Sequence, residues 1–258
     1  MKFLYTNGSS ITQGYPLDKL EVQQIYQQHY GFEFNTEREV NWPSRLGSLL
    51  NLQVIDESRH GGSIPRICRM TTEFINTTNT NDLKETLFIL EFPSGYRNEI
   101  WSNKLNRFFN YTIGLIDNER DGTEVFEDNQ KVRNSIVNYF SDFYNDEQNT
   151  KSDCRQFLGL ISLLKQKQLK FYIINQSITN DCKNYYKNIY HSLSIDDNVI
   201  LWDDTDCIVE WYWKRNNLCI KNDFNEKVSG LIDNDYHPGY FGHKKIAEYL
   251  HKCIKNQI

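Results

Sequence analysis

Two segments near opposite ends of the chain carry side chains that could act together in catalysis. The loop NGSSITQG follows the apolar run KFLYT and contains Ser10. The later segment DNDYHPG contains His237, preceded by Asp233 and Asp235. A serine needs a base to become nucleophilic at neutral pH, and a histidine base needs a carboxylate that fixes its tautomer and stabilises the imidazolium. The loop alone would also fit a simple helix cap, but the two segments together predict a Ser-His-Asp arrangement that attacks a carbonyl group.

These side chains can meet only if the fold brings the two ends of the chain together. Short apolar runs alternate with segments of helical periodicity, a pattern typical of parallel strands joined by crossover helices. The predicted strands cover residues 2–6, 53–57, 87–92, 170–175 and 198–202. The predicted helices cover residues 42–50, 64–75, 129–144, 154–168 and 241–254. We therefore expect a three-layer α/β/α sandwich with a five-stranded, mainly parallel sheet.

One domain covering residues 1–258 is expected, because no linker-like change in composition interrupts the chain. In an open α/β sheet, functional groups gather beyond the carboxyl ends of the strands, which is where the loop containing Ser10 would lie. Residues 97–129 and the Trp- and Tyr-rich segment 208–220 fit this pattern least well. We expect them to form a cap, an insertion or an edge.

Composition argues against several classes of protein. The net charge is -5 and the sequence pI is about 5.7, which disfavours a nucleic-acid partner. The six cysteines form no CxxC pair and are expected to be reduced thiols. No signal peptide or membrane span is visible, so we expect a cytoplasmic protein without a membrane partner. Without an HExxH motif or a Cys/His cluster, neither a metal nor a cofactor is expected.

The motifs at the two ends resemble those of the SGNH, or GDSL-type, hydrolase superfamily. The first block of that family, Gly-Asp-Ser-x-Thr-x-Gly, is similar to residues 8–14, with Ser9 in place of the aspartate. The last block, Asp-x-x-His-Pro followed by Gly-His, is similar to the segment from His237 to His243. The resemblance implies that Ser10 is the nucleophile and His237 the base, whereas we expect His243 to be structural.

The carboxylate of the expected triad is displaced relative to the family pattern. The family's aspartate lies three residues before the histidine, where this chain has Asn234. Asp235 is preferred because a divergent branch of the family, often encoded by phages, has Asp-x-His-Pro, and Asp233 is the alternative. Asn234 could orient the ring but could not stabilise its charge.

The resemblance also implies an oxyanion hole, of which the backbone N–H of Ser10 would be one donor. The family takes a second backbone N–H from a glycine after the second strand, which the segment HGGSIPRI matches. Gly61 is the first choice for this donor, and Gly62 is the second.

The third oxyanion donor departs from the family pattern. The usual Gly-x-Asn-Asp after the third strand is absent, and LEFPSGYRNEIW stands there instead. This segment resembles the divergent branch, which has an aromatic residue, a small hydroxyl residue and Arg-x-Glu at this point. Ser94 is therefore the expected donor, with Arg97 and Asn98 as alternatives. An ion pair between Arg97 and Glu99 is an equally good interpretation of those two residues.

The expected function is hydrolysis of an ester, with removal of an acyl group such as acetyl from a small molecule or a glycan. Aromatic side chains such as Trp211, Tyr212 and Trp213 could stack on sugar rings if they are exposed. Two alternatives remain, namely an acyltransferase with the same triad and a non-catalytic binding or structural protein that retains the fold. A flavodoxin-like nucleotide binder would explain the first loop but gives His237 no role. The sequence does not specify an oligomeric state.

Overall fold

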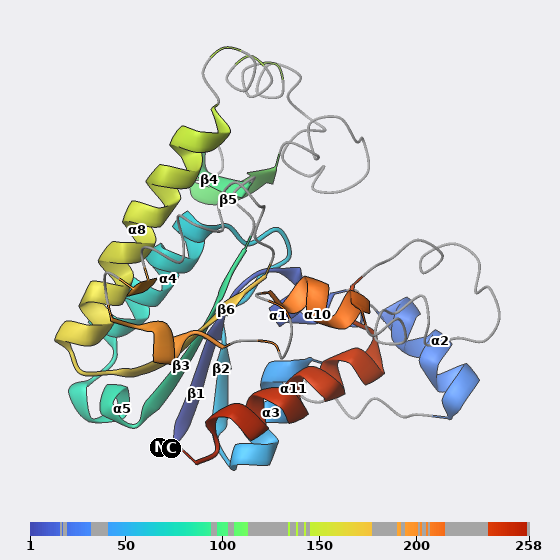
Figure 1. The fold of residues 1–258 in the computed structure, drawn as a ribbon. Coiled ribbons are helices and arrows are strands. Elements are labelled where there is room, and N and C mark those ends of the chain that lie inside the picture. Colours follow the sequence, from blue (N-terminus) through green and yellow to red (C-terminus); the bar gives the residue numbers. More distant parts are fainter. Residues whose placement is uncertain are drawn as a thin grey trace.

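A computed structural model of the chain shows how the predicted elements assemble (Figure 1). The structure describes residues 1–15, 17, 20–31, 41–93, 97–102, 106–112, 134, 138, 142, 145–176, 190–191, 194–200, 202, 205, 207–214 and 237–256. All statements below concern these residues.

A parallel four-stranded sheet forms the centre of the fold. Its strands lie in the order β2 (Gln53–Asp56), β1 (Phe3–Asn7), β3 (Thr86–Phe92) and β6 (Lys170–Asn175). Leu4 pairs with Val54 on one side and with Leu87 on the other. The mainly parallel α/β fold predicted from the sequence is confirmed, and four of its strands lie within one residue of the expected positions.

The predicted fifth strand at residues 198–202 is reduced to a short contact with the sheet edge. Val199 forms an isolated parallel bridge with Ile173, and the Ile200 N–H donates to the Ile173 carbonyl at 2.9 Å. A short 3-10 helix, η3 (Asp196–Asn198), precedes this contact. After it, the backbone N–H of Trp202 donates to the Thr205 carbonyl at 3.1 Å, and the Thr205 N–H donates to the Trp202 carbonyl at 2.8 Å. The described part of the sheet therefore has fewer strands than the sequence predicts.

Helices cover both faces of the sheet (Figure 1). One face carries α4 (Ile64–Thr77) and α8 (Asp146–Gln166), and the other carries α3 (Trp42–Leu50), α10 (Ile208–Lys214) and α11 (Tyr240–Ile254). Successive strand residues point to opposite faces. Accordingly, Leu4 packs in the core beside α3 and α11, whereas Tyr5 packs in the core beside α4 and α8.

Capping side chains set where the two helices that flank β2 begin. The Asn41 side chain accepts from the Ser44 N–H at 3.0 Å at the start of α3, and the Ser63 hydroxyl accepts from the Arg66 N–H at 3.4 Å at the start of α4. Both helices have proline in the first turn, where its missing N–H costs nothing. The Ser63 cap fixes the end of the loop that connects β2 to α4.

The segment expected to form a cap or insertion contains an antiparallel hairpin. Strands β4 (Arg97–Ser102) and β5 (Arg107–Thr112) form this separate two-stranded sheet. Residues 113–129 and most of the helix predicted at 129–144 lie outside the described residues. The helices α2 (Leu20–Tyr30) and α5 (Thr80–Lys84) were not predicted.

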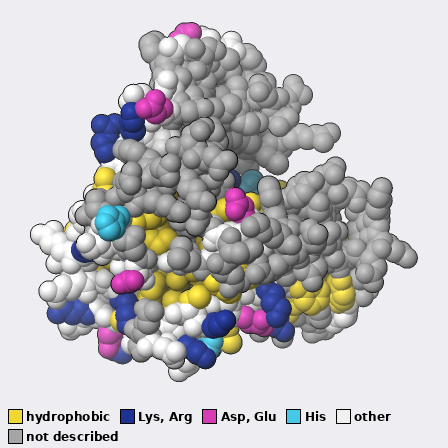
Figure 2. Space-filling model, in the orientation of Figure 1, with side chains coloured by type: hydrophobic (Ala, Val, Ile, Leu, Met, Phe, Trp, Pro, Cys, Tyr) yellow, Lys and Arg dark blue, Asp and Glu magenta, His cyan; other side chains and the backbone are white. Residues whose placement is uncertain are grey.

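The described surface carries charges of both signs. In Figure 2, Lys and Arg side chains lie interspersed with Asp and Glu side chains along the lower part of the face shown. No helix in the described part of the chain combines the length and the apolar character that crossing a membrane requires.

Candidate active site

Ser10 and His237 meet at the carboxyl end of β1. The chain leaves β1 through Gly8 and enters the short helix α1 (Ser10–Gln13), in which Ser10 is the first residue. The Ser10 Oγ lies 2.9 Å from the His237 Nε2, although 227 positions separate the two residues. Ser10 is buried and His237 is half-buried. When the ring proton is on Nδ1, the Nε2 atom can accept the serine proton.

A buried carboxylate that sequence reasoning missed holds the loop around Ser10. Glu91, on β3, accepts the Ser9 hydroxyl at 2.6 Å and the Ser9 N–H at 3.1 Å. It also accepts the Thr12 N–H at 3.1 Å and the Thr12 hydroxyl. The one signal in the sequence is an acidic residue inside the apolar run LFILEF.

The second loop of the site runs from β2 to α4 and lies against the first. The Arg59 N–H donates to the Gly8 carbonyl at 3.1 Å, which joins the two loops directly. The Gly62 N–H donates to the Arg59 carbonyl at 2.7 Å and is therefore engaged within the loop. Gly61 has a φ of +70° and open space where a Cβ would lie.

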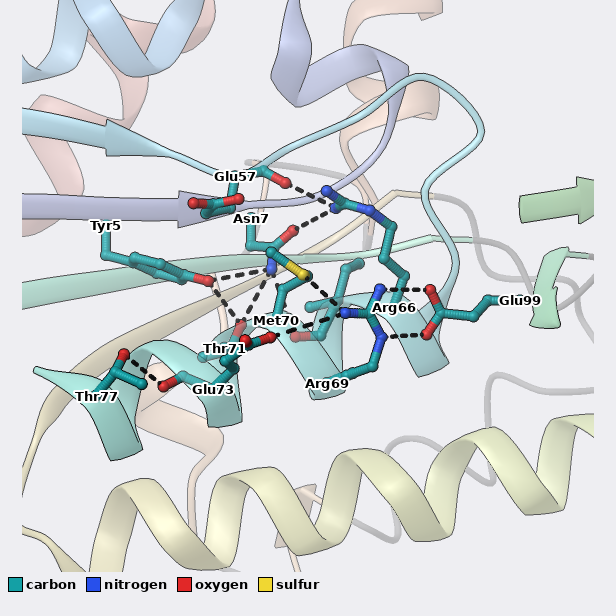
Figure 3. A network of polar contacts seen from close by, with 11 residues as sticks. Tyr5, Asn7, Glu57, Arg66, Arg69, Met70, Thr71, Glu73, Thr77 and Glu99 are labelled. Carbon is teal, nitrogen blue, oxygen red and sulfur yellow. Dashed lines mark hydrogen bonds and ion pairs between the residues drawn. The ribbon is translucent and has the colours of Figure 1, made fainter. Parts of the chain in front are cut away.

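A buried polar network anchors this second loop to β1 and α4 (Figure 3). Arg66 donates to the Glu57 carbonyl at 2.7 Å and to the Asn7 Oδ1 at 3.3 Å. The Asn7 amide in turn donates to the Tyr5 hydroxyl at 3.2 Å and to the Thr71 hydroxyl at 3.2 Å. Burial lowers the pKa of Arg66 and raises the pKa of Tyr5 to about 12. The network fixes the start of the second loop relative to β1, the strand that leads into the loop containing Ser10.

The candidates for the third oxyanion donor differ in how they are placed. Ser94 lies outside the described residues. The Asn98 amide donates to the Asn149 Oδ1 on α8 at 3.3 Å. The Arg97 Nη1 is buried and has no hydrogen-bond partner among the described residues, and burial lowers the pKa of Arg97. Of the two described candidates, Arg97 is the one with a buried donor nitrogen that makes no hydrogen bond to a described residue.

Glu99 pairs with a different arginine from the one considered in the sequence. Arg69, on α4, donates from Nε to the Glu99 Oε1 at 2.8 Å and from Nη2 to the Glu99 Oε2 at 2.7 Å. The Glu99 side chain is 5% exposed, and both of its oxygens are used in this bidentate pair. The Arg97–Glu99 ion pair is therefore wrong as an interpretation. The Glu99 pair instead joins the β4–β5 hairpin to α4.

An aromatic pair lies beside the His237 ring. The Tyr15 ring is 5.1 Å from the His237 ring in an edge arrangement, and it stacks on the His60 ring at 4.2 Å. His60 is exposed and directly precedes Gly61. The pair therefore joins the end of the first loop to the second loop. The carboxylate candidates Asp233 and Asp235, together with Asn234, lie outside the described residues.

His243 has a structural environment. It is fully buried, and its Nδ1 accepts the Trp42 N–H at 3.3 Å, which connects α11 to the start of α3. Burial lowers the pKa of His243 to about 3, so the ring is neutral at physiological pH. In the part of the chain that is described, no three His, Cys, Asp or Glu side chains are grouped so as to hold a metal ion.

The expectation that aromatic residues of α10 stack on a sugar is wrong for two of the three. Trp211 and Tyr212 are only 4% and 2% exposed, and both belong to the core between the sheet and α11. The Trp211 ring lies 5.1 Å from the Trp202 ring. The side chain of Trp213 lies outside the described part of the structure.

No protein-family model and no curated protein matches this chain. Solved structures resemble it over nearly its whole length. A putative lipolytic protein of the G-D-S-L family from Desulfitobacterium hafniense is 11% identical, with 98% of this chain and 100% of that chain covered and a TM-score of 0.48. The psychrotrophic esterase EstA from Pseudoalteromonas sp., inhibited by monoethylphosphonate, is 10% identical, with coverages of 99% and 98% and a TM-score of 0.49. A family two carbohydrate esterase from Clostridium thermocellum, in complex with cellohexaose, is 13% identical, with coverages of 99% and 64% and a TM-score of 0.48.

Proposed function

We propose that this chain is a serine ester hydrolase of the SGNH type. The observation that carries the proposal is the 2.9 Å contact between the Ser10 Oγ and the His237 Nε2. A serine hydroxyl bonded to an imidazole nitrogen at a loop junction is the pair that acyl transfer requires. Hydrogen bonds from Ser9 and Thr12 to Glu91 on β3 hold the loop on either side of Ser10.

The mechanism begins when His237 accepts the Ser10 proton as the Ser10 Oγ attacks the carbonyl carbon of the ester. The resulting tetrahedral intermediate expels the alkoxide, which takes the proton from the imidazolium. Water then attacks the acyl-serine with His237 again as base, and the carboxylic acid and free Ser10 are released. In the proposal, Asp235 orients the imidazole and stabilises its positive charge, with Asp233 as the alternative.

The oxyanion would be stabilised by donors from three places. The Ser10 N–H lies in the first turn of α1, where no earlier turn supplies a carbonyl acceptor. The Gly61 N–H is preferred to that of Gly62, because the latter is bonded to the Arg59 carbonyl. Ser94 is the proposed third donor, with Arg97 as its alternative. Loss of one such donor typically costs about 100-fold or more in rate.

The proposed substrate is an acyl ester, and an acetylated carbohydrate is the preferred class. The exposed ring of His60, stacked on Tyr15 beside His237, offers an aromatic surface at the site in place of the buried Trp211. Comparison of p-nitrophenyl acetate with an acetylated glucose tests this class. A His60→Ala variant should raise KM for the sugar ester and leave KM for p-nitrophenyl acetate unchanged.

The direct test of the function is hydrolysis of p-nitrophenyl acetate by the wild type and by Ser10→Ala. Removal of the nucleophile should lower kcat by at least about 1000-fold. Ser162→Ala is the matched control, because Ser162 is exposed on α8 and donates only to the Leu158 carbonyl among the described contacts. Equal rates for the wild type and Ser10→Ala would overturn the proposal.

A further inference from the structure

We infer that Glu91 is the positioning residue of the nucleophile loop and supplies from β3 the carboxylate that the loop lacks at Ser9. The inference rests on the proposed function, because it concerns how Ser10 is aimed. Glu91 does not contact the reacting atoms, and it acts through the residues on either side of Ser10.

Glu91 occupies a position that apolar burial alone would not select. It is 1% exposed and lies between the buried residues Leu90 and Phe92 in the middle layer of the fold. A carboxylate in such a place is tolerated only when hydrogen bonds satisfy it. Among the described residues, Ser9 and Thr12 donate hydrogen bonds to the Glu91 carboxylate, and they lie on either side of Ser10 in the same loop.

The arrangement of these contacts fixes both ends of the turn that holds Ser10. Ser9 is the N-cap residue of α1 and makes no side-chain cap within its own helix, and its hydroxyl donates to Glu91. Thr12, the third residue of α1, donates both its N–H and its hydroxyl to the same carboxylate. A capping box performs this task with side chains of the helix itself. Here a neighbouring strand performs it, and Ser10 lies between the two attachment points.

The packing around Gly8 shows that the loop is fitted closely to this carboxylate. A Cβ at Gly8 would lie 2.6 Å from the Glu91 Oε2 and 2.7 Å from the Glu91 Cβ. The Glu91 side chain therefore occupies the space that any larger residue at position 8 would need. A residue that only filled the core would not need to approach the loop backbone this closely.

The Glu91 carboxylate also acts electrostatically on Arg97. Arg97 is close enough to Glu91 for the carboxylate to raise its pKa, although burial has the larger and opposite effect. The Glu91 carboxylate therefore interacts favourably with the positive charge of Arg97 and with the N–H and O–H groups of Ser9 and Thr12. The positioning role resides in the hydrogen bonds, because these alone reach the residues beside Ser10.

Two substitutions at Glu91 separate hydrogen bonding from packing. Glu91→Gln keeps the shape and one carbonyl oxygen, which can still accept from the Ser9 N–H and from Thr12, while its amide can donate to the Ser9 hydroxyl. Glu91→Leu keeps an apolar filling and removes every acceptor. We expect kcat for p-nitrophenyl acetate to stay within about 5-fold of wild type in Glu91→Gln and to fall about 100-fold in Glu91→Leu, with KM changed less than about 2-fold in both.

Matched variants distinguish positioning from a merely structural role. Glu99→Gln alters another buried carboxylate, outside the loop, and should leave kcat unchanged. The double variant Ser9→Ala/Thr12→Val removes only the two hydroxyl contacts and should lower kcat about 10-fold. If Glu91→Leu does not fold, this double variant decides: wild-type kcat overturns the inference. A folded Glu91→Leu with wild-type kcat, or an equal loss in Glu99→Gln, overturns it too.

Amide proton exchange keeps this test independent of the proposed function. The Ser9 and Thr12 amides should exchange slowly in the wild type and in Glu91→Gln, and at least about 10-fold faster in Glu91→Leu. A wild type without esterase activity but with this exchange pattern would refute the function and leave the positioning role standing. Unchanged exchange in Glu91→Leu would refute the positioning role even in an active enzyme.

Discussion

Replacement of Gly62 by alanine should separate the two loops that form the candidate active site. A Cβ at this position would lie 2.4 Å from the Gly8 carbonyl oxygen and 2.9 Å from the Arg59 carbonyl oxygen, whereas ordinary contact begins at 3.4 Å. Both neighbours are backbone atoms, so no side-chain rotation can relieve the clash. The loops must therefore move apart by roughly 1 Å.

The size of the effect follows from this displacement. A shift of about 1 Å in a catalytic arrangement costs about 100-fold in rate, and overpacking of a buried position costs about 1–3 kcal/mol. We therefore expect Gly62→Ala to lower kcat for p-nitrophenyl acetate about 100-fold. The free energy of unfolding, measured in urea, should fall by about 1–3 kcal/mol.

Two other glycines separate close approach from backbone strain. Gly61 and Gly31 both have a φ of +70°, and a Cβ at either would meet no described atom within 4 Å. Alanine at each should cost about 1 kcal/mol of stability through strain alone. Gly31 follows α2, outside both loops, so Gly31→Ala should keep the wild-type kcat. The reasoning is refuted if Gly62→Ala keeps wild-type kcat, or if Gly31→Ala loses as much activity.

Three further predictions concern stability. Arg69→Met leaves the Glu99 carboxylate, which is 5% exposed, without its partner, and should lower the free energy of unfolding in urea by about 2 kcal/mol, whereas Glu99→Gln should cost less. Burial raises the pKa of Asp153 from its ordinary value of 3.8 to about 8 and lowers that of His243 from 6.5 to about 3. Asp153 therefore contributes stability that is full below about pH 4 and is lost as the pH rises to about 8, whereas His243 contributes stability that is full above about pH 6.5 and is lost as the pH falls to about 3. Between about pH 4 and 6.5 the two slopes oppose each other, so Asp153→Asn should make the free energy of unfolding rise with pH more steeply than in the wild type, by about 1.4 kcal/mol per pH unit. Parallel profiles would contradict this. Trp211→Ala should lower the free energy of unfolding by about 3–5 kcal/mol, because it leaves a cavity in the core. The same variant should not change KM for an acetylated sugar. A rise in KM for the sugar ester alone would support the sugar-stacking role.

Local patterns in the sequence were sufficient to predict most of the sheet. The run at residues 170–175 forms β6 with the expected bounds, because an apolar segment of this length must be buried on both faces in a parallel sheet. The run at 198–202 has the same apolar character but does not form a full strand. The Asn198 side chain donates to the Phe171 carbonyl at 2.8 Å, and the chain turns back between Trp202 and Thr205. The Asn198 contact depends on the neighbouring strand and cannot be predicted from the run itself.

The candidate site shows the same division between local and long-range information. The proximity of Ser10 and His237 could be predicted because a serine nucleophile needs a base, whatever the distance between the two residues in the sequence. The role of Glu91 could not, because its partners lie 79 and 82 positions away and become visible only when β3 is placed beside β1. Trp211 was misplaced because a short amphipathic segment does not reveal which of its faces meets the core.

The most direct measurement of the central claim is covalent labelling by a serine-directed p-nitrophenyl phosphonate, with the adduct located by peptide mass spectrometry. If Ser10 is activated by His237, the adduct should appear on Ser10 at one per chain, and His237→Gln should slow labelling by at least about 100-fold. A label on another residue, or labelling of Ser10 at the wild-type rate in His237→Gln, would contradict the account.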